Sequence, residues 1–95
     1  MKEIYNQKDK TNCKVRSLKN FTHPKHPDYK LFAHRNLENT GYNVSEESTG
    51  AAVVSGRPSL RQAIKDANRR LSETSPELIK TAVQAAYKNG VGRKV

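Results

Sequence analysis

Residues 41–71 read GYNVSEESTGAAVVSGRPSLRQAIKDANRRL, and this segment carries the clearest signals of secondary structure. A strand is predicted where Tyr42 and Val44 alternate with polar residues, because successive side chains of a strand point to opposite faces. The turn-rich run 46–50 then leads into a second apolar run at 51–54. The sequence therefore predicts a hairpin that is followed by a helix.

The helix is predicted over residues 59–72. Ser59 with Gln62 three residues later matches a capping box, the signature of a helix start. The apolar residues that follow fall on one narrow stripe at helical spacing, and they are Leu60, Ala63, Ile64, Ala67 and Leu71. We expect this stripe to lie against a sheet.

A second helix is predicted over residues 76–89. Ser75 suits the N-cap, Pro76 the first helical position, and Gly90 the position just past the end. Its apolar face is wide and rich in alanine. We expect it to pack in the core, so that aspartate at Leu78 or Ile79 unfolds the protein.

Upstream of this stretch, the segment from Tyr29 to Leu37 also alternates and predicts a first strand. Together these elements give a three-stranded antiparallel meander over residues 29–55 followed by two helices, in one compact α+β domain of residues 29–95. An uncovered edge near residues 29–37 leaves a homodimer open. The run from Gly41 to Leu71 resembles the compact strand-strand-helix units of small proteins carried by phages and plasmids.

Residues 1–28 differ from the rest of the chain. They hold only four of its eighteen Leu, Ile, Val and Phe residues, and they show no sustained period. Pro24 and Pro27 favour extended backbone before them. The sequence therefore predicts a basic, flexible and poorly ordered N-terminal arm.

Charge is the strongest functional signal. The formal net charge is +9 and the sequence pI is about 9.9, which favours a polyanionic partner. Arg61, Lys65 and Arg69 stand at positions i, i+4 and i+8 of the first predicted helix, which places them along one ridge. The full set of candidate nucleic-acid-binding residues is Arg61, Lys65, Arg69, Arg70, Lys8, Lys10, Lys14 and Arg16.

Signals of other chemistry are weak. The chain has no glycine-rich phosphate loop and no nucleophile elbow, so we expect no enzyme and no cofactor. Cys13, His23 and His26 lack the paired cysteines of a structural zinc site, so we expect no metal. No apolar run is long enough for a membrane span, and the lone cysteine fits a reducing compartment, which predicts a cytoplasmic protein.

The sequence thus favours a small basic accessory protein that binds DNA or RNA through phosphate-backbone contacts with little sequence specificity. The alternative is a protein-protein interaction module, an inhibitor or adaptor of phage or plasmid type, that docks on an acidic partner surface. Aromatic residues among the basic ones of the first third, such as Phe21 and Tyr29, leave base stacking open.

Overall fold

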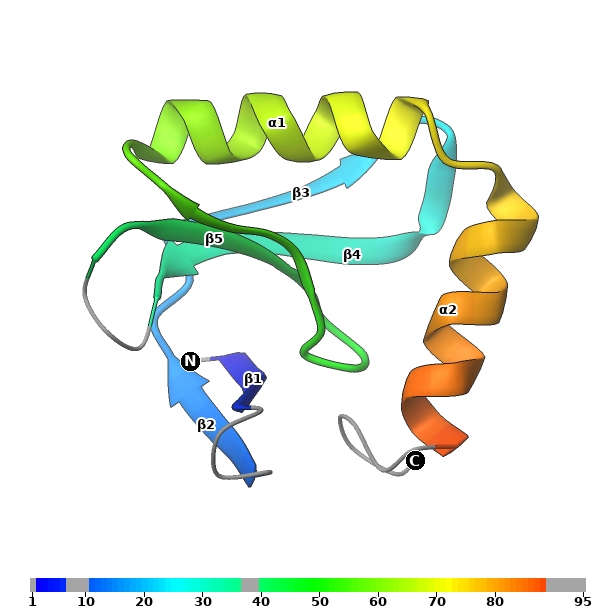
Figure 1. Ribbon diagram of the computed structural model, residues 1–95, viewed down its shortest axis with the longest axis horizontal. Helices are drawn as coiled ribbons and strands as arrows, with labels where there is room; N and C mark the ends of the chain where they lie inside the picture. Colours follow the sequence, from blue (N-terminus) through cyan, green and yellow to red (C-terminus); the bar gives the residue numbers. More distant parts are fainter. Residues whose placement is uncertain (1, 7–10, 37–39, 89–95) are drawn as a thin grey trace.

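A computed structural model describes residues 2–6, 11–36 and 40–88. The strands and helices follow one another along the chain as in Figure 1. The elements are β1 (Lys2–Asn6), β2 (Thr11–Val15), β3 (Lys19–His23), β4 (His26–Arg35), β5 (Tyr42–Glu46), β6 (Ala52–Arg57), α1 (Leu60–Ser72) and α2 (Pro76–Lys88). Within these described residues, neither helix is long and apolar enough to cross a membrane.

The strands form an antiparallel sheet of four, in the order β3-β4-β5-β6, and a separate hairpin of β1 and β2. The α+β class is confirmed, but the predicted meander of three strands is wrong by one strand. The additional strand is β3, and β4 begins at His26 rather than at Tyr29. Pro27 does not prevent β4 from forming, although it lacks a backbone N–H, because it lies next to the start of the strand.

The core lies between α1 and one face of the sheet. Leu31 and Ala33 of β4 point to this face, and Ala33 pairs directly with Val44 of β5. From α1, Ala63 and Ala67 are completely buried. Alanines at these positions let the helix approach the strands closely, and α1 contacts all four of them (Figure 1).

The opposite face of the sheet is covered in part by the β1–β2 hairpin. Phe32, which breaks the alternation seen in the sequence, points to this face and packs with Ile4 and Val15. Each of the three side chains is buried. This hairpin therefore gives the protein a second, smaller core.

The predicted N-terminal arm is consequently wrong wherever residues 1–28 are described. These residues form β1, β2, β3 and the beginning of β4, and the predicted boundary after residue 28 falls inside β4. The prediction was wrong because it relied on the small number of apolar residues in this segment. A hairpin that packs on an existing sheet needs few of them, and here Ile4 and Val15 face inward.

Two turns hold β5 between its neighbours. Gly41 lies against the end of β6, where an added Cβ would come within 2.8 Å of the Arg57 carbonyl oxygen, so only glycine fits. The β5–β6 turn is built on Glu46, whose carboxylate accepts hydrogen bonds from the backbone N–H and hydroxyl of both Ser48 and Thr49. Glu46 is therefore buried, and it holds the turn together.

Both helices begin where the sequence predicts. The Ser59 hydroxyl accepts from the backbone N–H of Gln62 at 3.1 Å, and that of Ser75 accepts from Leu78 at 3.2 Å. Gln62 does not complete the capping box, because its side chain donates to Asp66 instead. Residue 89, the predicted end of the second helix, lies outside the described residues.

Candidate nucleic-acid interface

The exposed side of α1 carries the predicted ridge of Arg61, Lys65 and Arg69. All three side chains are exposed, and they stand away from Ala63 and Ala67, which face the sheet. Residues four apart in a helix are separated by about 6 Å along its axis, so the ridge places a cation at each turn. This spacing suits a row of phosphates.

A polar cleft of about 280 Å³ opens beside the ridge, between α1 and the edge strand β6. We call it the arginine cleft. Its lining consists of Val54, Arg57, Asp66, Arg69, Arg70 and Glu73. Because Arg69 also belongs to the ridge, the ridge and the cleft form one cationic surface.

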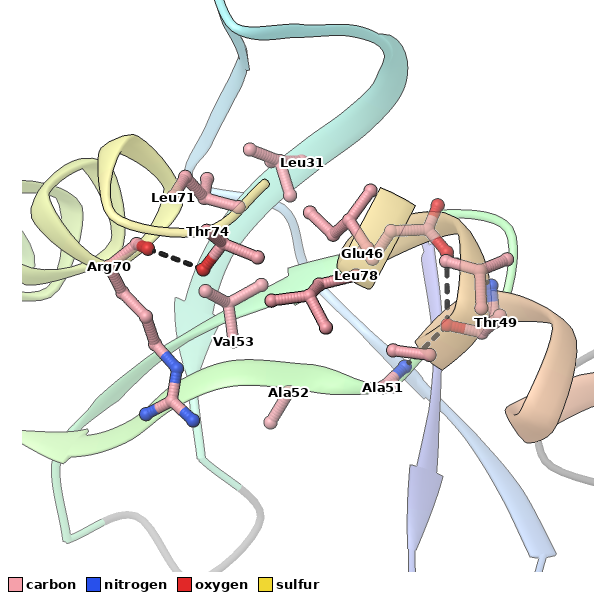
Figure 2. A pocket seen from close by; sticks show the side chains of 13 residues that line it. Leu31, Glu46, Thr49, Ala51, Ala52, Val53, Arg70, Leu71, Thr74 and Leu78 are labelled. Atoms are coloured by element: carbon pink, nitrogen blue, oxygen red, sulfur yellow. Dashed lines mark hydrogen bonds between the residues drawn. The ribbon is translucent and has the colours of Figure 1, made fainter. Parts of the chain in front are cut away.

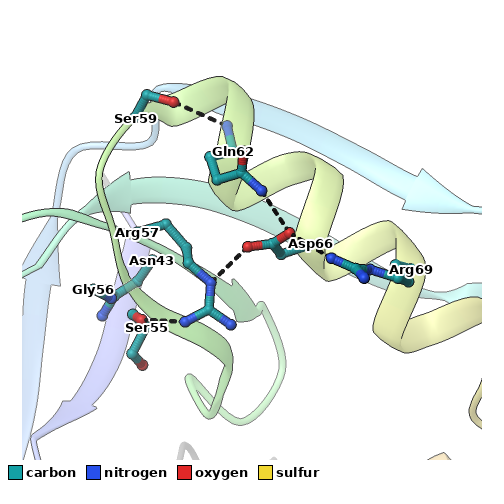
Figure 3. A network of polar contacts seen from close by, with 8 residues as sticks. All are labelled: Asn43, Ser55, Gly56, Arg57, Ser59, Gln62, Asp66 and Arg69. Atoms are coloured by element: carbon teal, nitrogen blue, oxygen red, sulfur yellow. Dashed lines mark hydrogen bonds and ion pairs between the residues drawn. The ribbon is translucent and has the colours of Figure 1, made fainter.

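Asp66 organises this surface (Figure 3). Its carboxylate accepts from Arg57 Nε at 2.7 Å and from Gln62 Nε2 at 2.7 Å, and it forms a longer ion pair with Arg69 Nη2 at 3.3 Å. Desolvation would raise the pKa of Asp66, but the hydrogen bonds from Gln62, Arg57 and Arg69 outweigh it and lower the pKa below its ordinary value. Asp66 therefore stays ionised and holds the guanidinium groups in place.

Arg57 was not identified from the sequence, because it lies beyond the predicted meander of residues 29–55. The strand in fact continues to Arg57, whose Nη1 also donates to the Ser55 carbonyl at 2.9 Å. Two fixed donors leave this guanidinium little freedom. The sequence held one signal that could have identified Arg57. Asp66 is the one acid between Arg57 and Glu73, and an acid among cations can pair with a cation from another part of the chain.

Arg70 differs from the other arginines of the cleft. Across residues 2–6, 11–36 and 40–88, its guanidinium has neither a hydrogen bond nor an ion pair, and its side chain is exposed. Its backbone carbonyl accepts from the Thr74 hydroxyl at 2.7 Å. Arg70 is therefore the arginine of the cleft that is most available to an external anion.

The structure does not bring the remaining candidates to this surface. Lys14 on β2 and Arg16 just after it are exposed, but they belong to the hairpin that covers the opposite face of the sheet. Lys8 and Lys10 lie outside the described residues. Phe21, an aromatic candidate for stacking, packs against the main core instead.

The histidines are structural. His34 Nδ1 donates to the Arg35 carbonyl at 2.7 Å, and its Nε2 accepts from the Ser45 hydroxyl at 2.8 Å. Burial lowers the pKa of His34, although the bond to Arg35 opposes the shift, so the ring is neutral at pH 7. The His34–Ser45 pair has the spacing of a base and a nucleophile, but both residues are buried beyond the reach of a substrate.

His23 and His26 also form hydrogen bonds within the protein. His26 is buried, and its Nε2 donates toward the carbonyls of Leu71 and Thr74 at the end of α1. His23 Nδ1 accepts from the backbone N–H of Lys25. Among the residues that the structure describes, no group of three or more His, Cys, Asp and Glu side chains is placed to hold a metal ion.

Comparison of the chain with protein-family models, with curated proteins and with solved structures finds no match. The case for a function of the cationic surface therefore rests on its own geometry and charge.

Proposed function

We propose that this protein binds nucleic acid through the phosphate backbone, using the ridge and the arginine cleft, with little sequence specificity. The observation that carries the proposal is that the ridge and the arginine cleft form one continuous surface. Arg69 joins the ridge on α1 to Arg57 and Arg70 in the cleft, and Asp66 fixes part of this set in advance. Cations held in place lose less side-chain entropy when they bind phosphates.

The overall charge of +9 supports the same proposal. Each phosphate that a lysine or arginine neutralises releases condensed counterions, which adds affinity that does not depend on base sequence. Contacts to phosphates fix the position of a protein on a nucleic acid, while contacts to base edges are needed for sequence discrimination. Lysine and arginine side chains arranged in a row along a helix serve the first purpose.

The test is the salt dependence of binding to a labelled duplex of about 20 base pairs. For the parent protein, log K should fall linearly with log salt concentration. Joint replacement R61Q/K65Q/R69Q should flatten the slope by about two to three units, since each lost contact removes about 0.9 released counterions. Glutamine keeps helix propensity, so the fold should persist.

A control of equal charge is K19Q/K30Q/K80Q, which removes three exposed cations from β3, β4 and α2. It lowers the net charge by the same amount but leaves the ridge intact, so it should change the slope much less. Equal slopes for the two triple variants would show that binding follows net charge rather than the ridge. No binding by the parent at low salt would remove the proposal.

A protein-interaction module is the second candidate, and one observation favours it. Leu78 on α2 has 62% of its surface exposed, which is unusual for a large apolar side chain in a helix. An acidic protein with an apolar anchor could use this residue together with Arg70. If the purified protein carries no nucleic acid that high salt removes, and retains a partner after nuclease treatment, this candidate leads.

A further inference from the structure

A second cavity, of about 330 Å³, lies next to the arginine cleft, and we call it the apolar groove. It is bounded by α2, by the β5–β6 hairpin and by the end of α1, as Figure 2 shows. Its apolar lining includes Leu31, Val53, Leu71, Leu78, Ile79 and Val83. A cavity of this volume falls within the range of small-ligand sites.

The groove and the cleft share one residue, Arg70, which lines both. In Figure 2 its side chain extends from α1 past Val53, at the side of the groove. Val53 lines the groove and Val54 lines the cleft, so adjacent residues of β6 separate the two cavities. A ligand with an anionic group beside a flat apolar group could occupy both.

The charges around the groove favour an anionic ligand. Among the residues that line it, the charged ones are Glu46 and Arg70. The Glu46 carboxylate is already engaged by Ser48 and Thr49, whereas the Arg70 guanidinium has no acceptor among the described residues. Arg70 is therefore the charged side chain of the lining that is left to pair with a ligand, and it pairs with an anion.

We propose that the apolar groove accepts an unpaired base of a single-stranded nucleic acid, while a neighbouring phosphate of the same strand lies in the arginine cleft. This inference rests on the proposed function and narrows it to single strands. In a duplex the base faces are stacked and the edges are paired, so no base is free to enter a groove. In a single strand, bases are free to lie on arginine planes, and their faces can be buried against apolar side chains.

The groove offers little by which to read the identity of the base. The hydroxyl of Thr49 donates to Glu46 and accepts from the Ala51 N–H, and the hydroxyl of Thr74 donates to the Arg70 carbonyl. Side-chain groups already paired within the protein are poor partners for base edges. The preference for single strands should therefore be tolerant of sequence.

The experiment compares a labelled single strand of about 20 thymidines with a duplex of the same length at matched salt. Burial of one base against the aliphatic side chains of the groove should make the parent bind the single strand roughly five- to tenfold more tightly than the ridge contacts alone would give. Leu78→Asn removes one wall of the groove at an exposed position. It should weaken single-strand binding about five- to tenfold and leave duplex binding unchanged.

Leu18→Asn is the matched control, because Leu18 is the other large apolar residue that is exposed among the described residues, at 42%, and it lies just before β3. It should change neither affinity. Arg70→Gln should weaken single-strand binding more than duplex binding, whereas Lys65→Gln should weaken both alike.

The outcomes separate this inference from the proposed function. Salt-dependent binding that is equal for single strand and duplex, or equal losses for Leu78→Asn and Leu18→Asn, would overturn the inference while nucleic-acid binding stands. Absence of binding to either would remove both. A parent that sediments as a dimer and becomes monomeric with Leu78→Asn would assign the groove to a second copy of the chain, which also overturns the inference.

Discussion

The two helices begin alike and end in different surroundings. Both α1 and α2 have thirteen residues and a serine that caps the first turn. Three residues of α1, Ala63, Ala67 and Leu71, are buried against the sheet. In α2, Ile79 packs against the core, Leu78 is largely exposed and Ala82 is exposed as well.

The difference shows that an apolar stripe does not by itself decide where a helix packs. α1 lies across the sheet and contacts four strands, whereas α2 lies beside one end of the sheet, as Figure 1 shows. Most helix stability in proteins comes from tertiary packing rather than from propensity. We therefore expect α1 to carry the stability of the fold, and α2 to supply apolar surface beside the arginine cleft.

The largest effect should come from truncating one leucine in each helix. Leu71→Ala removes a buried side chain and should cost about 3 kcal/mol of unfolding free energy, which lowers Tm by roughly 12 to 24 °C. Leu78→Ala should cost less than about 1 kcal/mol, because most of that side chain already contacts water.

Thermal melting of both variants measures this contrast. Equal losses would mean that α2 is docked as firmly as α1, as the sequence suggested. The exposure of Leu78 also changes the expectation for Leu78→Asp, which should now be tolerated. Ile79→Asp should still be disruptive, because Ile79 packs against the main core.

A smaller effect is expected from the caps. Ser59→Ala should cost about 1 kcal/mol, since it leaves the Gln62 N–H without its acceptor at the start of a helix on which the core depends. Ser75→Ala removes a similar bond to Leu78 N–H, but the loss should appear as local fraying of α2. Amide hydrogen exchange over residues 77–79, measured together with Tm, distinguishes the two. Matching Tm losses without faster exchange would contradict the contrast.

The smallest effect should be a change in Tm at acid pH, caused by the loss of the Asp66 carboxylate on α1. Because the pKa of Asp66 is lowered in the folded protein, its carboxylate stabilises the fold above its ordinary pKa of about 4, and this contribution is lost as pH falls through the lower folded value. Asp66→Asn should therefore flatten the fall of Tm below about pH 4. Glu77→Asn, at the exposed first turn of α2, is the control. An unchanged acid profile for Asp66→Asn would show that the Arg57–Asp66 pair does not tie α1 to β6.

Features that depend on neighbouring residues could be predicted from the sequence. The caps at Ser59 and Ser75 placed both helix starts, the turn-rich run 46–50 placed the end of β5, and the spacing of Arg61, Lys65 and Arg69 predicted an exposed ridge. These signals are local, because a cap, a tight turn or one side of a helix is specified within a few residues.

Features that join distant parts of the chain depend on the tertiary structure and could not be predicted. Strand β3 forms because it pairs with β4, and the N-terminal hairpin is held in place because it packs on Phe32. Arg57 became part of the cleft by pairing with Asp66 across the gap between β6 and α1. The exposure of Leu78 depends on where α2 leaves the sheet. A periodic pattern tells which side of an element is apolar, but it holds no information on which other element, if any, will cover that side.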